Sequence, residues 1–273
     1  MIMKRVGILI SCLLFALFLM VSGAGVLNAA MQEVAMIAQI DAAAPNADAM
    51  VTVAHFAPFF ATDVASTAVT ITVNGGVVLT NTTFGAIAPA LPLPAGMYTV
   101  AIFPGSSITP AITATVTVTD DTKYTLAAIG DGSNQPLELL ALVDDTTPLT
   151  ESAKLRIGHL APFAANLAET AVDICTDSNT IVVPNVPYKV VTAPYLALPP
   201  GDYDLKIALA GTSCGTVALD LPSVRLAAGD IVDVFAVGLN NAAFPLAIET
   251  TTGLTLTPSI TYLPLILEGV VTR

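Results

Sequence analysis

Two stretches of the chain, "VTVAHFAPFF" at 51–60 and "LRIGHLAPFA" at 155–164, are versions of one pattern. Each is an apolar run that ends in a histidine, with a proline and a phenylalanine three and four residues later. His55 and His159 are the only histidines in the chain, and they lie 104 residues apart. The chain therefore contains an internal repeat, and we expect its two copies to fold alike.

The repeat extends well beyond the histidines. "NTTFGAIAPALPLPAGMYTV" at 81–100 corresponds to "NVPYKVVTAPYLALPPGDYDL" at 185–205. Its period is far longer than the roughly 20 to 50 residues of a solenoid repeat, so two independent tandem domains of the same topology are expected. The repeated motif consists of these aligned pairs: His55 and His159, Pro58 and Pro162, Gly96 and Gly201, and Tyr98 and Tyr203.

Strand signals within each copy are short and frequent, and no amphipathic helix is visible after the N-terminal segment. "AVTITVNGGVVLT" at 68–80 is two alternating runs around Asn74-Gly75, which suits a tight hairpin with positive φ at both central residues. About seven such runs in each copy of roughly 100 residues are typical of a sandwich. The sequence predicts an all-β fold of two tandem immunoglobulin-like β-sandwich domains.

A proline-glycine segment precedes each repeated tyrosine, "LPAG" at 93–96 and "LPPG" at 198–201. A frame that suits both copies places the glycine third in a type II turn, which requires positive φ there. We therefore predict such turns at Gly96 and Gly201, each leading into the strand with Tyr98 or Tyr203.

The N-terminus has the three-part pattern of a secretory signal peptide: Lys4 and Arg5, an apolar run from Val6 to Val21, and then small residues. The alternative is a retained membrane anchor. The expected organisation is a signal peptide at 1–30, an N-terminal arm at 31–49, domain 1 at 50–143, a linker at 144–153, domain 2 at 154–252 and a C-terminal tail at 253–273.

The composition limits the partners of the protein. With a net charge of -12, its surface repels nucleic-acid phosphates, so we expect no nucleic-acid partner. We expect contact with a membrane only through an uncleaved N-terminal segment. The apolar "YLPLIL" at 262–267 is too short to span a bilayer, which takes about 20 residues, and is expected to be an edge strand or an ordered tail.

Cys175 and Cys214 form an even pair in a chain with an export signal, which predicts one disulfide. The alternative is two free buried thiols. Thr72 stands opposite Cys175 in the repeat, so only the second copy would be cross-linked. A zinc site is not expected, because the chain has no CxxC motif and its histidines lie elsewhere.

No GxSxG, HExxH, P-loop or dinucleotide-binding motif occurs, so we expect no catalytic, cofactor-binding or metal-binding residues. His55 and His159 are interpreted as structural: a ring N–H bonded to a backbone carbonyl would hold the first strand to the turn that follows. Ligand contact, metal binding and catalysis are the alternatives. Calcium is an alternative to solvated turns for three acidic sites, Asp120-Asp121, Asp131 and Asp144-Asp145.

In the segments "HFAPF", "HLAPF", "PALPLPAGMYTV" and "PYLALPPGDYDL", the chain resembles the DUF4397 family, and the resemblance covers about residues 50 to 250. The resemblance implies an exported bacterial or archaeal protein with no established activity. The family pattern has an aspartate soon after the His-Pro motif, where Asp63 and Asn166 stand nearby in this chain.

These observations favour an exported, non-catalytic cell-surface or extracellular module with a structural or adhesive role and an unidentified partner. The alternative is an extracellular module that binds carbohydrate, peptide or calcium. A sugar site would need exposed aromatic platforms, and the chain has no tryptophan.

Overall fold

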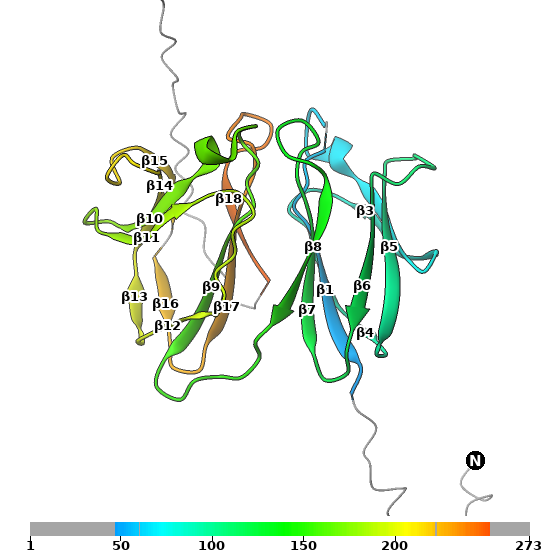
Figure 1. The fold of residues 1–273 in the computed structure, drawn as a ribbon, viewed down its shortest axis with the longest axis horizontal. Coiled ribbons are helices and arrows are strands. Elements are labelled where there is room, and N and C mark those ends of the chain that lie inside the picture. The colour runs from blue at the N-terminus through cyan, green and yellow to red at the C-terminus, as the bar shows by residue number, and fades with distance from the viewer. Residues whose placement is uncertain (1–46, 60, 222, 252–273) are drawn as a thin grey trace, which may run out of the picture. The chain divides into compact units, whose positions relative to one another are not determined.

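The computed structural model describes residues 47–251 except 60 and 222, and this part of the chain is all-β (Figure 1). Its only helical elements are two short 3-10 turns, η1 (Ala65–Thr67) and η2 (Leu167–Thr170). Among the described residues, no helix is long and apolar enough to cross a membrane. The expected signal peptide, most of the N-terminal arm and the tail lie outside the described residues.

The first half, residues 47–144, consists of two four-stranded sheets. The first sheet has the order β4-β1-β7-β8, with β4 at Ile87–Leu93, β1 at Ala49–His55, β7 at Lys123–Ile129 and β8 at Glu138–Asp144. The second sheet has the order β3-β2-β5-β6, with β3 at Gly76–Thr82, β2 at Val69–Val73, β5 at Gly96–Pro104 and β6 at Ile112–Val118.

The second half, residues 153–251, repeats this order. One sheet runs β12-β9-β17-β18, with β12 at Leu196–Leu198, β9 at Ala153–His159, β17 at Ile231–Val237 and β18 at Ala247–Thr250. The other runs β11-β10-β14-β15, with β11 at Ile181–Val186, β10 at Val172–Thr176, β14 at Leu205–Leu209 and β15 at Val217–Asp220, and beside it β13 (Gly201–Tyr203) pairs with β16 (Val224–Leu226). The matching order confirms that the copies share a topology.

In each half, the two central strands of one sheet run parallel to each other. These pairs are β1 with β7 in the first half and β9 with β17 in the second. In β7, Leu126 and Ala128 pack in the core of the first half. The alternate residues, Ala127 and Ile129, belong to a second apolar cluster, which includes residues of both halves. Burial on both faces explains why this strand is apolar almost throughout.

We call this second group the interdomain cluster. Its buried members from the first half are Ala54, Phe56, Ala127 and Ile129, and those from the second half are Leu160, Tyr188, Phe235 and Val237. The described residues form one compact unit, and the chain between β8 and β9 is short. The halves are therefore repeats in topology, but they are not independent of each other in packing.

Two turn predictions have opposite outcomes. The hairpin at Asn74-Gly75 is confirmed, with φ of 49° and 79° and with β2 and β3 paired on either side. The type II turns are wrong, because neither Gly96 nor Gly201 has a positive φ, and each begins a strand. A Cβ added at Gly96 would meet the Tyr98 ring at 3.6 Å, an ordinary van der Waals contact.

Glycine is required at the end of β7. Gly130 has a φ of +88°, and a Cβ added there would lie 2.0 Å from the carbonyl oxygen of Pro136. Gly75 has a similar φ of +79° but nothing within 4 Å of its Cβ position. We predict that Gly75→Ala lowers the free energy of unfolding by about 1 to 2 kcal/mol, the cost of left-handed backbone. Gly130→Ala should cost distinctly more, because backbone must also move.

Urea unfolding of both variants measures this difference. Equal losses would contradict the assigned contact between Gly130 and the backbone of Pro136.

Candidate functional site

Each repeated histidine closes the same corner of its half. Nε2 of His55 donates to the carbonyl oxygen of Thr67 at 3.0 Å, and Nε2 of His159 donates to that of Thr170 at 2.7 Å. Both rings are buried, and both bonds join the last residue of a first strand to the 3-10 turn that follows. The bond has the form that the sequence interpretation requires, and its contribution to stability stays a prediction.

The threonine of each corner fastens a further segment. Its side-chain oxygen accepts a backbone N–H, from Phe84 at 2.7 Å in the first half and from Tyr188 at 2.8 Å in the second. The histidine carbonyl oxygen accepts another, from Gly85 at 2.8 Å and from Lys189 at 2.7 Å. One histidine and one threonine thus hold three chain segments together in each half.

The other repeated residues lie around this corner or at the opposite end of the sandwich. His55 contacts the ring of Phe59 at 5.3 Å between centroids, and Pro58 lies between them in the loop after β1. Pro162 occupies the equivalent loop after β9. In β5 and in β13, the repeated tyrosine hydroxyls donate to proline carbonyls: Tyr98 to Pro94 at 2.8 Å, and Tyr203 to Pro199 at 2.7 Å.

Burial keeps both histidines neutral. Removal from water lowers the pKa of His55 to about 4 and also lowers the pKa of His159, although the bond to the carbonyl opposes each shift. The second ring nitrogen, Nδ1, is buried without a hydrogen-bond partner in both residues. Among the described residues, no group of three or more His, Cys, Asp or Glu side chains could hold a metal ion.

The disulfide between Cys175 and Cys214 is present, with 6.2 Å between the Cα atoms. It ties β10 to the turn between β14 and β15, and both cysteines are buried with Ala208. Thr72, the counterpart of Cys175, lies in β2 of the first half, which has no such cross-link among its described residues. The bond closes a separation of 39 residues, which stabilises by roughly 3 to 4 kcal/mol in the chain-entropy model.

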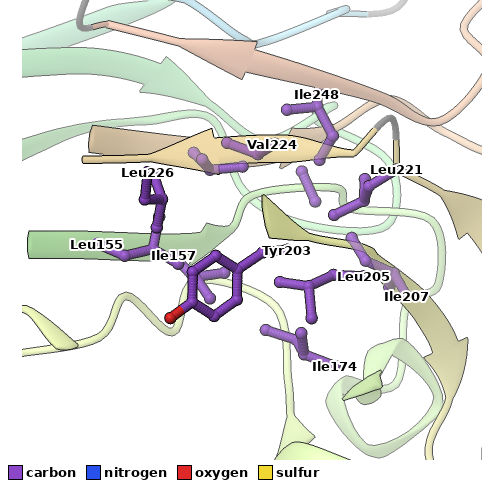
Figure 2. Close-up of a pocket in the computed structure, with 12 residues that line it drawn as sticks. Leu155, Ile157, Ile174, Tyr203, Leu205, Ile207, Leu221, Val224, Leu226 and Ile248 are labelled. Carbon is purple, nitrogen blue, oxygen red and sulfur yellow. The ribbon is translucent and has the colours of Figure 1, made fainter. Parts of the chain in front are cut away.

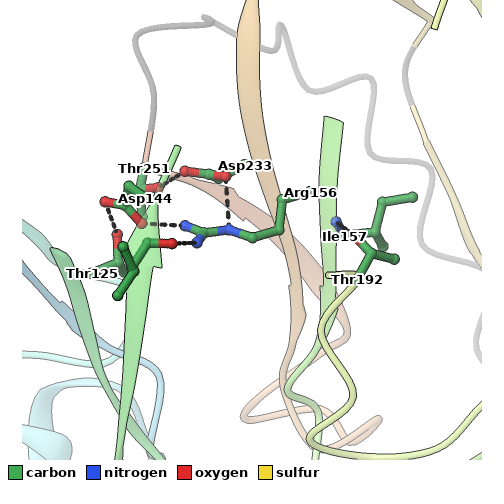
Figure 3. A network of polar contacts seen from close by, with 8 residues as sticks. Thr125, Asp144, Arg156, Ile157, Thr192, Asp233 and Thr251 are labelled. Carbon is green, nitrogen blue, oxygen red and sulfur yellow. Dashed lines mark hydrogen bonds and ion pairs between the residues drawn. The ribbon is translucent and has the colours of Figure 1, made fainter. Parts of the chain in front are cut away.

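A buried polar network lies beside the interdomain cluster (Figure 3). Its centre is Arg156 in β9, whose Nη2 lies 2.6 Å from Oδ1 of Asp144 in β8. Nε of the same guanidinium lies 2.8 Å from Oδ1 of Asp233 in β17. All three side chains are at least nine-tenths buried, so the cation of one half is paired with a carboxylate from each half.

Further groups complete the environment of this network. Thr125 donates to Oδ2 of Asp144 at 2.9 Å, and Thr251 donates to Oδ2 of Asp233 at 3.1 Å. The guanidinium carbon lies 5.0 Å from the centre of the Tyr195 ring and 5.7 Å from that of Phe235. Burial raises the pKa of Asp144, and its bond from Arg156 opposes that shift. The network therefore holds charges in a place that water does not reach.

Asp131 and Asp144, which the sequence assigned to solvated turns, are buried, so that interpretation is wrong for both residues, whereas the side chain of Asp145 is exposed and pairs with Lys154. Asp144 ends a strand inside the network, because β8 continues beyond the expected linker boundary. Asp131 is 3% exposed, and its Oδ1 accepts the backbone N–H groups of its own loop. That loop reaches the other half: Asn134 donates to the carbonyl of Pro162 at 3.1 Å. Asp120 and Asp121 instead bond exposed backbone N–H groups.

An apolar pocket of about 50 Å³ lies between the two sheets of the second half (Figure 2). The equivalent space in the first half is about 20 Å³. Aliphatic side chains from both sheets make up most of its lining, among them Leu155, Ile157, Ile174, Leu205, Val224 and Ile248. The sequence interpretation did not include this pocket.

The fold and its repeated corners define the class: an all-β protein built from two tandem copies of one sandwich. The family model described as "Domain of unknown function (DUF4397)" matches residues 49–168 and 165–257. Together these matches span most of the chain, so the chain belongs to the DUF4397 family and contains two copies of its domain.

Other comparisons add little. A search of curated proteins finds no match. Among solved structures, the chain is similar to a leucine-rich repeat protein from Bacteroides thetaiotaomicron, with 13% identity and a TM-score of 0.18. That match covers 69% of this chain and 26% of the other, so the chain spans about a quarter of that protein's length. A likeness at this TM-score carries no argument.

The lowered histidine pKa values predict how stability depends on pH. Below pH 6.5 the unfolded chain gains a proton on each histidine, whereas folded His55 stays neutral down to about pH 4. The contribution of the neutral, buried histidines to the free energy of unfolding is therefore fully present above pH 6.5 and is lost as the pH falls. For His55 the loss between pH 7 and pH 5 should be about 2 kcal/mol.

Urea unfolding at both pH values, with wild type and His55→Gln, measures this loss. The variant should be less stable at pH 7 and should lose less between pH 7 and pH 5. The comparison removes the effect of Asp144 and Glu249, whose raised pKa values act in the opposite direction. An identical pH dependence in both proteins would contradict the assignment.

Removal of the central cation of the network should be costly. We predict that Arg156→Ala lowers the free energy of unfolding by about 3 to 5 kcal/mol, because Asp144 and Asp233 would remain buried without their cation. Arg225→Ala is the matched control, since its pair with Asp202 is exposed and 3.9 Å long, and should cost less than about 1 kcal/mol. Denaturant unfolding of both variants gives the comparison; a similar small loss would show that the network is unimportant.

Proposed function

We propose that this protein is an exported, non-catalytic structural or adhesive module of the cell surface or extracellular space. The observation that carries the proposal is the joining of its two sandwiches into one unit by the interdomain cluster and the Arg156 network. Tandem domains joined only by a flexible linker bend relative to each other, whereas a shared apolar core resists bending. A unit of this kind is suited to transmitting force or holding a fixed spacing.

Several features support a location outside the cytoplasm. The disulfide is of the kind that persists in oxidising compartments. The sequence of residues 1–30 has the pattern of a signal peptide, and the net charge of -12 favours solubility.

The state of the histidines supports a non-catalytic role. Both rings are buried, and each already uses one nitrogen to bond a backbone carbonyl. A general base must reach a substrate proton, which these positions do not allow without local unfolding.

The finer fold class is also a proposal. Each half has the size and the two-layer arrangement of an immunoglobulin-like sandwich. The parallel central pairs are a departure from the antiparallel sheets of that fold, so we use the term for the architecture and not for an identical strand order.

A ligand-binding module is the second candidate, and the apolar pocket of the second half is the observation that favours it. The two roles are compatible, since a rigid surface module can also bind a ligand.

Rigidity is tested by distance measurement between spin labels, one in each half, in the full chain with Cys12→Ser and the native disulfide intact. Ile108→Cys is a suitable site at 95% exposure, and Val182→Cys at 47%. A single narrow distance distribution is expected, and it should broaden with Arg156→Ala. A broad distribution in the otherwise native protein would rule out a rigid module.

Location is tested separately with antibodies against residues 47–251, applied to intact and to lysed cells of the source organism. Staining of intact cells, or recovery of the protein from the medium, is expected. Detection only after lysis would contradict the proposed location.

A further inference from the structure

The pocket of the second half coincides with a break in one sheet. In the first half, β5 and β6 pair continuously from Gly96 and Val118 to Ile102 and Ile112. In the second half, the pairing of β13 with β16 stops at Tyr203 and Val224. Pairing of β14 with β15 resumes at Lys206 and Asp220. The sheet that is continuous in one copy is thus divided in the other.

The cause is one extra residue. Thr113 of β6 is the counterpart of Asp220, and Val116 of β6 is the counterpart of Val224. In each case the two residues pair with equivalent residues of the neighbouring strand. Two residues separate Thr113 from Val116, and three residues, 221–223, separate Asp220 from Val224. An extra residue in one strand is a β-bulge, which disrupts the ladder locally and bends the strand.

The interior of the second half is less completely buried beside this break. Ile157 lies in the central strand β9 and lines the pocket, yet its side chain is only partly buried. Its counterpart in the first half, Val53, is 6% exposed. Leu205, Leu221 and Val224, which flank the break, are also only partly buried (Figure 2). The opening therefore lies where the sheet is divided.

The lining selects an apolar ligand. All but one of the lining residues are aliphatic, and the hydroxyl of the exception, Tyr203, already donates to the carbonyl of Pro199. A space of about 50 Å³ without hydrogen-bonding groups does not favour water. A space of this volume is too small for a ring system and suits the end of a single alkyl chain.

The charge of the surface beside the opening indicates which polar head group a bound alkyl chain could have. Asp202, Asp204 and Asp220 are exposed there, each next to a lining residue in the chain. Of the nearby cations, Arg225 pairs with Asp202, and Lys206 bonds the side chain of Asn179. The excess of negative charge repels a carboxylate or phosphate head group.

We propose that the second half binds the alkyl chain of an uncharged, single-chain amphiphile, with the chain between the sheets and the head group at the break near Asp204. This binding site goes beyond the structural role and does not depend on it. The first half, with its continuous sheet, has no equivalent activity.

The test is a methyl NMR titration of the full chain with 1-octanol and, separately, with octanoate. We expect saturable shifts at Ile157 and Ile174 and none at Ile71 and Ile102 of the first half. Affinity should be at least tenfold higher for octanol than for octanoate. Across short alcohols from ethanol upward, each added methylene should raise the affinity about fourfold until the chain end fills the pocket, after which the affinity should level off.

Val224→Phe should weaken octanol binding at least tenfold by filling the opening, whereas Met97→Phe, at an exposed position of the first half, should leave it unchanged. The wild-type titration remains decisive if Val224→Phe does not fold. Absence of saturable shifts, or equal shifts in both halves, would overturn the proposal. So would binding that appears only after residues 252–273 are deleted, because the chain's own C-terminal segment would then be the occupant.

Discussion

The burial of two parallel strand pairs on both faces is the constraint on which the rest of the structure depends. β1 with β7, and β9 with β17, provide the inner wall of each sandwich core and also the contact between the halves. Such strands are largely apolar because most of both faces is shielded from water, and β9 departs from this pattern at Lys154 and Arg156. Buried polar side chains do occur in these strands, among them Thr125, Arg156 and Asp233, and the charge of Arg156 is tolerated because a carboxylate lies on each side of its guanidinium.

The histidine corners act within each half and the disulfide acts within the second half, whereas the interdomain cluster and the Arg156 network act between the halves. His55 and His159 fasten the end of a first strand to the next turn, which positions Phe56 and Leu160 for the interdomain cluster immediately afterwards. The repeated histidine motif therefore connects the local fold of each copy with the packing of one copy on the other.

Much of the fold could be predicted from the sequence, because it rests on local signals and on repetition. The Asn74-Gly75 hairpin follows from turn chemistry, and the common topology follows from the repeat. The partners of Arg156 could not be predicted, since Asp144 and Asp233 form no short motif and meet it only through the fold. The apolar character of both faces of "YTLAAIG" was a usable signal of the interdomain contact. The pocket could not be predicted from the sequence alone, because only the pairing register of the strands shows where the extra residue lies.

The central claim is that two copies of one sandwich form a single cooperative unit. Differential scanning calorimetry of the full chain tests it most directly, because the calorimetric and van't Hoff enthalpies agree only when the whole molecule unfolds in one step. The account predicts one transition with a ratio of these enthalpies near one. Two resolved transitions, each with about half of the enthalpy, would show that the halves fold independently and would contradict it.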